Sequence, residues 1–259
     1  MNSVSPHHSN HLRIIPKLDI KAPNLVKGVR MEGFRVIGNP VEYAEKYADD
    51  GADELFYQDI VASLYRRDNI FDLVKMTAAK VFVPLTVGGG LRTVSDVRSA
   101  LRHGADRVVI NTAVIESPKL IAEAASIFGS QCVIVGVEAT KTGEKSWEPL
   151  VNCGRDRTGK DVAEWVSEVE SLGAGEIFLT SVDSDGVRRG LDFGLLQTVR
   201  NKVSLPLVLH GGAWEIDDLA RAWQGGASGV ALASSLHYRK LSIRDVKASL
   251  NAQGIPVRM

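Results

Sequence analysis

The sequence has few of the residues that mark several classes of protein. Its two cysteines, Cys132 and Cys153, are too few for a disulfide framework and fit a reduced cytosolic protein. No apolar run approaches the roughly 18 residues that a membrane-spanning helix needs. Lysine and arginine together number 31, and aspartate and glutamate together also number 31. The chain therefore has no excess of basic residues that would favour binding to nucleic acid or to a membrane surface. We therefore expect a cytoplasmic protein with neither of these partners.

The usual signatures of cofactor binding are also missing. The sequence has no Cys/His cluster, no Ser-His-Asp arrangement and no dinucleotide-binding fingerprint, so we predict no metal and no cofactor. His210 is an unexpected residue at the end of an apolar run. It can be a catalytic group, but a single histidine without a companion ligand does not make a metal site.

Two segments of the chain differ in composition. Residues 1–11 are polar and contain no apolar stretch of the kind found in secretory signals, so we expect a disordered N-terminal extension. Residues 12–259 are numerous enough for one large barrel domain.

Apolar, β-rich runs alternate with amphipathic stretches along this domain. We expect strands at 13–19, 54–60, 81–87, 107–111, 131–138, 176–181, 205–210 and 229–233. We expect helices at 40–50, 70–79, 94–103, 118–128, 161–172, 193–201, 215–224 and 243–252. Strand alternating with helix predicts a parallel sheet, and eight such units predict an α/β fold closed into a (β/α)8 TIM barrel.

The two halves of the expected barrel resemble each other. Two short motifs recur at a constant offset of about half the chain: Gly89-Gly90 with Gly211-Gly212, and Asn111-Thr112 with Ala233-Ser234. A constant offset favours a barrel built from two similar half-barrels over two unlike domains.

Both glycine pairs follow an expected strand and precede an expected helix. Glycine lets backbone N–H groups approach an anion, and the following helix adds the positive end of its dipole. Asn111-Thr112 completes one cradle and Ala233-Ser234 completes the other. Two cradles at one barrel mouth predict a ligand with a phosphate at each end. The alternative is that both are tight turns without a ligand.

Carboxylates stand where several expected strands end, at Asp19, Asp59, Glu138 and Asp183. Barrel enzymes place their chemistry at the carboxyl ends of the strands. Asp19 and Glu138, on opposite sides of the mouth, are therefore the predicted acid/base pair. Asp59 and Asp183 are expected to hold hydroxyl groups or to support neighbouring residues.

Charged residues also begin four expected strands, at the other end of the barrel: Arg13, Glu54, Arg107 and Glu176. Two cations and two anions can form a neutral ring that closes the barrel floor. They can equally be ordinary surface ion pairs, which contribute little to stability. On the sequence pattern alone, the surface ion pairs are favoured.

Two of the connections between strand and helix are long. Residues 21–39 carry Lys27 and several glycines, and we expect this loop to close over a ligand. Residues 140–160 are polar and rich in turn-forming residues.

Together these motifs resemble the cyclase subunit of imidazole glycerol phosphate synthase, the HisF family, over residues 12–258. The matching stretches are 13–19 (RIIPKLD), 86–90 (TVGGG), 110–113 (INTA), 128–131 (FGSQ), 173–176 (GAGE) and 180–186 (TSVDSDG). The resemblance implies a heterodimer with a glutaminase, which supplies ammonia. The cyclase would then convert a bisphosphorylated ribulosyl aminoimidazole carboxamide substrate to imidazole glycerol phosphate in histidine biosynthesis.

The resemblance also implies roles for individual residues. Asp19 and Glu138 would be catalytic, and Lys27 would lie in a mobile loop. The phosphate-binding residues would be Gly90, Asn111 and Thr112 at one site, and Asp185, Gly186, Gly212, Ala233 and Ser234 at the other. The gate through which ammonia enters would consist of Arg13, Glu54, Arg107 and Glu176.

Three residues depart from the family pattern. Glu138 stands where aspartate is usual, Arg107 where lysine is usual, and His210 where a small residue is usual. These departures leave two other functions open. One is a HisF-like paralogue that passes ammonia to a sugar amidination step in surface-polysaccharide synthesis. The other is a non-catalytic scaffold that activates a glutaminase.

Overall fold

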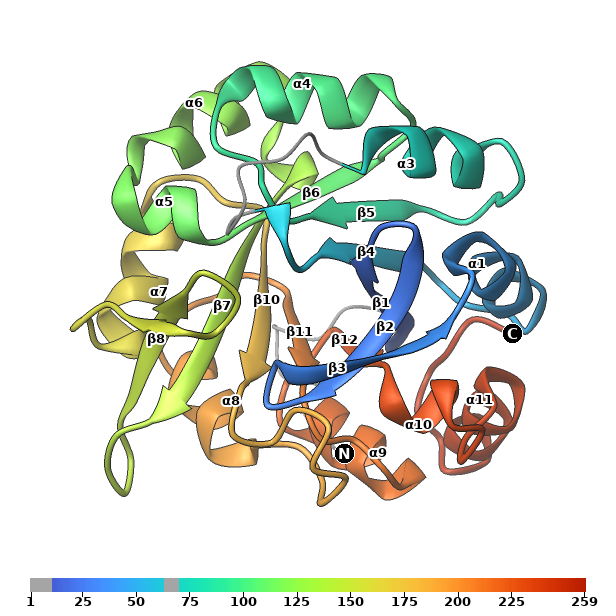
Figure 1. Ribbon diagram of the computed structural model, residues 1–259. Coiled ribbons are helices and arrows are strands. Elements are labelled where there is room, and N and C mark those ends of the chain that lie inside the picture. The colour runs from blue at the N-terminus through green and yellow to red at the C-terminus, as the bar shows by residue number, and fades with distance from the viewer. Residues whose placement is uncertain (1–10, 63–69) are drawn as a thin grey trace.

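The computed structural model describes residues 11–62 and 70–259. Eight parallel strands form a closed barrel with helices around its outside, which confirms the predicted (β/α)8 architecture (Figure 1). Around the barrel these are β1 (Arg13–Lys21), β4 (Leu55–Asp59), β5 (Leu85–Gly88), β6 (Arg107–Ile110), β7 (Val133–Lys141), β10 (Glu176–Ser181), β11 (Leu207–His210) and β12 (Gly229–Leu232). Pairing of β12 with β1 and of β7 with β10 closes the ring. The extension expected at 1–11 lies, except for its last residue, outside the described residues.

All eight predicted helices are present, close to their expected bounds. They are α1 (Pro40–Asp49), α3 (Phe71–Ala78), α4 (Val94–Arg102), α6 (Lys119–Phe128), α7 (Val162–Ser171), α8 (Phe193–Arg200), α9 (Ile216–Gln224) and α11 (Ile243–Ala252). Local capping explains several starts. The Asn39 side chain accepts from the N–H of Val41 at 2.9 Å, and Thr93 and Asp96 form a reciprocal capping box.

Four strands begin later than the apolar pattern predicted: β4 by one residue, β7 and β11 by two, and β5 by four. We expected strands from residues 81 and 205, whereas β5 begins at Leu85 and β11 at Leu207. Each of these strands follows a proline within two residues, Pro84 and Pro206. Because proline has no N–H to donate, it interrupts the ladder of hydrogen bonds.

Two β-hairpins extend the barrel where the sequence indicated only long loops. One consists of β2 (Asn24–Val29) and β3 (Glu32–Gly38), and the other of β8 (Trp147–Val151) and β9 (Asp156–Arg157). The two-residue turn of the first, Arg30-Met31, has φ of 52° and 60°. Such turns are usually marked by Asn-Gly or Asp-Gly, so non-glycine residues in this conformation concealed the hairpin.

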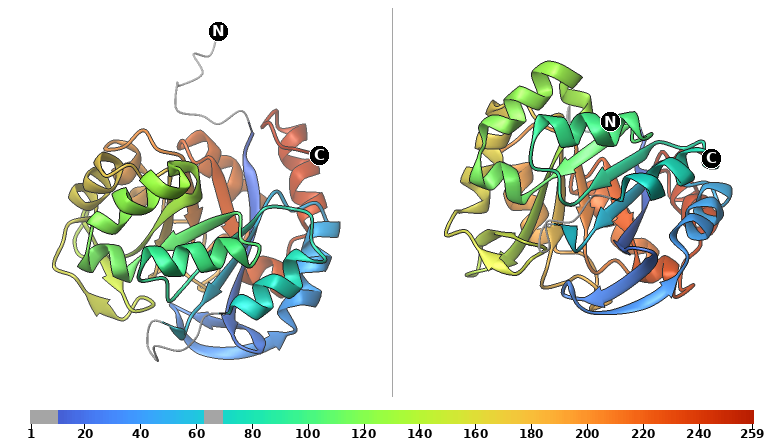
Figure 2. Two further views of the ribbon diagram at one scale, coloured as in Figure 1. Left: turned by 90° about the horizontal axis from the view of Figure 1, so that it is seen from above. Right: turned by 45° about the horizontal axis from the view of Figure 1, so that its top comes forward.

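The two halves of the barrel carry the same additions at the same places. Hairpins are attached to β1 and to β7, and short helices α5 (Thr112–Glu116) and α10 (Ser234–His237) follow β6 and β12. The residues before these helices share an unusual backbone conformation, φ −120° and ψ −83° at Asn111 and φ −130° and ψ −83° at Ala233. Figure 2 (left) shows both hairpins at the same end of the barrel.

The core forms two layers. An outer layer of apolar side chains packs between strands and helices, whereas an inner layer fills the barrel itself. The inner layer consists of Ile15, Phe56, Val109, Ile134, Phe178, Val208 and Ala231. Along β1 the inward positions alternate, so that Arg13, Ile15, Lys17 and Asp19 follow one another from the barrel floor to its mouth.

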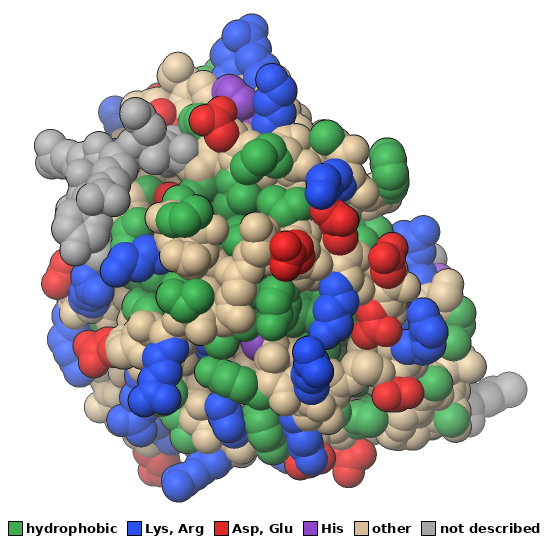
Figure 3. Space-filling model, turned by 45° about the vertical axis from the view of Figure 1, so that its right-hand side comes forward, with side chains coloured by type: hydrophobic (Ala, Val, Ile, Leu, Met, Phe, Trp, Pro, Cys, Tyr) green, Lys and Arg blue, Asp and Glu red, His purple; other side chains and the backbone are tan. Residues whose placement is uncertain are grey.

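In residues 11–62 and 70–259, no helix is long and apolar enough to cross a bilayer. Figure 3 shows basic and acidic side chains both spread across the face in view.

Candidate active site

The two predicted catalytic carboxylates lie inside the barrel mouth. Asp19 on β1 is 3% exposed, and Glu138 on β7 is 8% exposed. Glu138 lines a cavity of about 490 Å³, the main cavity, together with Gly90, Asn111 and Thr112. The first predicted cradle and one predicted catalytic residue therefore share one space.

Glu138 has the electrostatic surroundings of a proton donor. Its Oε2 atom is buried and has no hydrogen-bond partner among the described residues. Burial raises the pKa of Glu138 to about 7, although Lys17 and the backbone N–H of Gly154 act in the opposite direction. Near neutral pH this side chain can both give and take a proton.

Asp19 has the opposite character. Its carboxylate accepts a hydrogen bond from Lys17 Nζ and lies 3.5 Å from Lys27 Nζ. Burial favours the neutral acid, but attraction to these two cations outweighs it and lowers the pKa of Asp19 below 3.8. The two carboxylates therefore differ in protonation: Asp19 stays ionised, whereas Glu138 can exchange a proton near neutral pH.

Lys17 is a site residue for which the sequence analysis predicted no role. It is 3% exposed, lines the main cavity, and its Nζ lies 5.7 Å from the centroid of the Phe56 ring. The alternation of inward positions along β1, from Arg13 to Asp19, was the signal that places Lys17 inside the barrel.

The first cradle has the close backbone packing that glycine permits. Gly89 has φ of +94°, and a Cβ added there would lie 2.1 Å from the carbonyl oxygen of Asp59. Asn111 Nδ2 donates to the carbonyl of Leu150 at 3.0 Å, whereas its buried Oδ1 has no partner among the described residues. Thr112 Oγ1 accepts from the N–H of Asn152, which ties the cradle to hairpin β8–β9.

The residues expected to form the second cradle lie together, but little space is left between them. Its five predicted residues, Asp185, Gly186, Gly212, Ala233 and Ser234, line one pocket together with His210. The volume of this pocket is about 10 Å³, compared with about 490 Å³ for the main cavity. A cavity volume of this kind needs to be about 10–15 Å³ to hold one water molecule, so the second cradle has room for about one.

His210 accounts for part of this filling, and Lys27 binds Asp185 beside the pocket. Lys27, expected in a mobile loop, lies instead on strand β2 and is 3% exposed. Its Nζ lies 2.8 Å from Asp185 Oδ2, and His210 Nε2 lies 3.4 Å from Asp185 Oδ1. Burial raises the pKa of Asp185, but Lys27 and the hydrogen bond from His210 prevail and lower it. His210 has no companion ligands: within residues 11–62 and 70–259 no three His, Cys, Asp or Glu side chains could share a metal ion.

Asp59 and Asp183 support the mouth. Asp59 Oδ1 accepts from the N–H groups of Val61 and Ala62, each at 2.9 Å. Asp183 accepts from the hydroxyl of Thr140 at 3.0 Å and from the N–H of Lys141 at 2.7 Å. Asp183 thus fixes the end of β7, three residues beyond Glu138.

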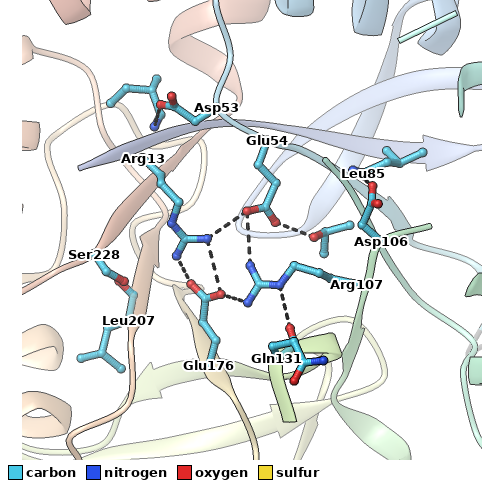
Figure 4. Close-up of polar contacts among 12 residues, drawn as sticks. Arg13, Asp53, Glu54, Leu85, Asp106, Arg107, Gln131, Glu176, Leu207 and Ser228 are labelled. Atoms are coloured by element: carbon cyan, nitrogen blue, oxygen red, sulfur yellow. Dashed lines mark hydrogen bonds and ion pairs between the residues drawn. The ribbon is translucent and has the colours of Figure 1, made fainter. Parts of the chain in front are cut away.

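At the barrel floor, the four charged residues at the strand starts meet in one ring, the charged ring (Figure 4). Arg13 lies 2.9 Å and Arg107 3.3 Å from Glu54, and both arginines also bind Glu176. The two carboxylates are at most 5% exposed, so these contacts are not ordinary surface ion pairs. The inner apolar layer lies between this ring and the mouth, since Ile15 stands between Arg13 and Lys17 on β1.

Comparison with known proteins gives consistent matches. The sequence profile of a family described as "Histidine biosynthesis protein" matches residues 13–242. A protein of Endomicrobium trichonymphae, named "Imidazole glycerol phosphate synthase subunit HisF", is 44% identical over 247 residues, which cover 95% of each chain. A protein of Legionella pneumophila with the same name is 50% identical over 209 residues, which cover 81% of this chain and 99% of that protein.

Proposed function

The chain belongs to the histidine biosynthesis protein family, and from this membership and the site we propose that it is the cyclase subunit of imidazole glycerol phosphate synthase. It uses ammonia from a glutaminase partner to act on a bisphosphorylated ribulosyl aminoimidazole carboxamide. The products are imidazole glycerol phosphate and an aminoimidazole carboxamide nucleotide. The observation that carries this proposal is that Glu138, the first cradle and Lys17 line one cavity, with Asp19 bound to Lys17 behind it.

In this function the two carboxylates have different roles. Glu138 in its neutral form gives a proton to the reacting group and later takes one back, for which its pKa of about 7 is suited. Asp19 stays ionised beside Lys17 and Lys27 and stabilises positive charge that develops on the nitrogen. The substrate's phosphates are bound by the N–H groups of the two cradles.

The barrel interior supports an ammonia route from the floor to the mouth. Arg13 and Arg107 keep 24% and 19% of their side chains exposed, so solvent or a partner can reach the charged ring. Beyond the ring, the inner apolar layer favours neutral ammonia over charged ammonium. A glutaminase bound at the floor would deliver ammonia directly into this route.

Growth of a histidine auxotroph tests the proposal. A strain without its own cyclase subunit should grow without histidine when it expresses this chain. Glu138→Asp is the informative companion variant, because one methylene shifts the carboxylate by about 1 Å, enough to change a rate about 100-fold. If Glu138→Asp alone restores growth, the natural protein has left the histidine pathway.

A second function is favoured by the second cradle. A ligand with two phosphates requires space at the second cradle, where the pocket has only about 10 Å³, compared with about 490 Å³ in the main cavity. An ammonia-delivering paralogue, which passes ammonia to a separate acceptor such as a sugar, has no such requirement. This second function predicts glutamine-dependent release of ammonia by the complex without turnover of the ribulosyl substrate. A non-catalytic scaffold predicts instead that Asp19→Asn leaves every activity of the complex unchanged.

A further inference from the structure

Lys17 is the cation that a ligand in the main cavity would meet. The lining of this cavity includes Lys17 and Glu138, whereas Asp19 is not among the described residues that line it. Asp19 lies behind Lys17 and binds its Nζ. Of the two charged groups at the mouth end of β1, the lysine and not the aspartate faces the cavity.

The ammonium group of Lys17 has donors to spare. In the described part of the chain, Asp19 is the one hydrogen-bond acceptor of Lys17 Nζ. An ammonium group carries three N–H donors. Two therefore remain for a ligand, on a side chain that is 3% exposed and has little contact with water. A buried donor without an acceptor is unfavourable, so a ligand that supplies one is bound more strongly.

Lys17 also stands where the barrel interior opens into the cavity. On β1 it follows Ile15, a member of the inner apolar layer, and its Nζ lies over the ring of Phe56, another member. A molecule that passes from the charged ring through the apolar layer along β1 would meet Lys17 where it enters the main cavity. Lys17 is thus at the meeting point of ammonia and its acceptor.

Resting on the proposed function, we propose that Lys17 is a catalytic residue. Its ammonium group donates a hydrogen bond to the carbonyl oxygen of the ribulosyl substrate while ammonia adds to the carbonyl carbon. This addition places negative charge on the oxygen, and a fixed cation in a water-poor site stabilises such charge more strongly than water does.

The step balances without any further reactant. The lone pair of ammonia forms the new carbon–nitrogen bond, and the π electrons of the carbonyl group move to oxygen. Glu138 in its acid form gives its proton to this oxygen, and the resulting carboxylate takes one proton from the new ammonium nitrogen. Lys17 remains an ammonium ion throughout, and the product is the neutral carbinolamine.

A structural role for Lys17 would produce a different pattern of effects. If Lys17 only held Asp19 in place, replacing it would have no consequence once Asp19 is also neutral. If Lys17 binds the carbonyl oxygen, its loss is felt whatever stands at position 19. The comparison of Asp19→Asn with the double variant Lys17→Met/Asp19→Asn separates the two. Both variants avoid a buried carboxylate without a cation, so the pair remains measurable even if Lys17→Met alone fails to fold.

The experiment measures kcat and KM of the full-length protein with ammonium chloride and the ribulosyl substrate. We expect Lys17→Met to lower kcat by about 100-fold or more, as loss of one oxyanion donor does in other enzymes. We expect Lys17→Arg, which keeps the positive charge, to retain part of the kcat that Lys17→Met loses. The double variant should be at least about tenfold slower than Asp19→Asn alone, by the same reasoning. A kcat of the double variant equal to that of Asp19→Asn would overturn the proposal.

Lys247→Met is the matched control. Lys247, on α11, is 5% exposed and lies 2.7 Å from Asp53, so it is also a buried lysine bound to an aspartate, but away from the cavity. We expect its kcat to remain unchanged within about twofold even if its melting temperature falls. If Lys247→Met loses as much kcat as Lys17→Met does, the loss in Lys17→Met reflects lower stability and not a role in catalysis. No turnover by the unmodified, folded protein would refute the proposed function itself, and the role of Lys17 with it.

Discussion

The buried carboxyl of Glu138 makes the stability of this protein depend on pH in a particular direction. Its pKa is about 7 in the folded protein and about 4.5 in a solvated chain. Below pH 4.5 both states hold the proton, and Glu138 contributes nothing. Between pH 4.5 and 7 only the folded state holds it, so stability falls as the pH rises. Above pH 7 both states are ionised, and the full cost of burying the charge is present.

Glutamine removes this dependence, because it resembles the neutral acid in shape and does not ionise. The difference between 4.5 and about 7 corresponds to about 3 kcal/mol. We therefore expect Glu138→Gln to raise the free energy of unfolding by up to about 3 kcal/mol at pH 8.5 and by almost nothing at pH 4.5. The same variant should lose its proton-transfer activity, so that stability and activity change in opposite directions.

Urea denaturation at several pH values between 4.5 and 8.5 tests this prediction. Glu148→Gln is the matched control, since the N–H of Gly159 holds the pKa of Glu148 below 4.5. It should therefore lose stability at high pH instead of gaining it. If the curves for the unmodified protein and for Glu138→Gln run parallel across this range, Glu138 is not a buried group that ionises near pH 7.

Three further changes have definite expected outcomes. Gly89→Ala should lower the free energy of unfolding by about 2 kcal/mol more than Gly51→Ala does. Both glycines have φ of +94°, but only at Gly89 would an added Cβ collide with its neighbours. Equal melting temperatures of the two variants would contradict this. Glu176→Gln should cost about 3 kcal/mol in urea denaturation, because Arg13 and Arg107 lose a shared, buried partner; an unchanged midpoint would mean that the ring carries no net stability. His210→Ala should enlarge the second cradle and strengthen binding of inorganic phosphate severalfold in calorimetry, whereas an unchanged Kd would show that His210 does not limit this pocket.

The barrel could be predicted from the sequence because its signals are local and repeated. Each strand is a short apolar run, each helix has a periodic apolar face, and several helices begin at a capping residue such as Asn39 or Thr93. The hairpins could not be predicted, because Arg30 and Met31 adopt positive φ without the glycine that usually reports it. In that turn, tertiary contacts stabilise a backbone conformation that non-glycine residues rarely adopt. One such contact is the hydrogen bond from the Arg30 N–H to the carbonyl oxygen of Asp185.

It was easier to predict which residues form the site than how much space the folded chain leaves between them. Strand-end position brought Glu138, Asn111 and Thr112 to one cavity, and Asp185 and Ser234 to another. Which cradle is open depends on how the hairpin packs against the 185–186 turn, and such long-range packing leaves no local pattern. The alternation of inward and outward residues along β1 predicts that Lys17 points into the barrel. The chemical role of Lys17, however, depends on neighbours that only the fold brings together.

We propose above all that this barrel adds ammonia to a bisphosphorylated ribulosyl substrate. The most direct test of this proposal is incubation of the purified chain with ammonium chloride and that substrate near pH 7, where Glu138 is partly protonated, followed by separation of the products. We expect imidazole glycerol phosphate and the aminoimidazole carboxamide nucleotide in equal amounts, and loss of both products with Glu138→Gln. Intact substrate after incubation with a folded protein would contradict it, and would leave delivery of ammonia to another acceptor as the function of the barrel.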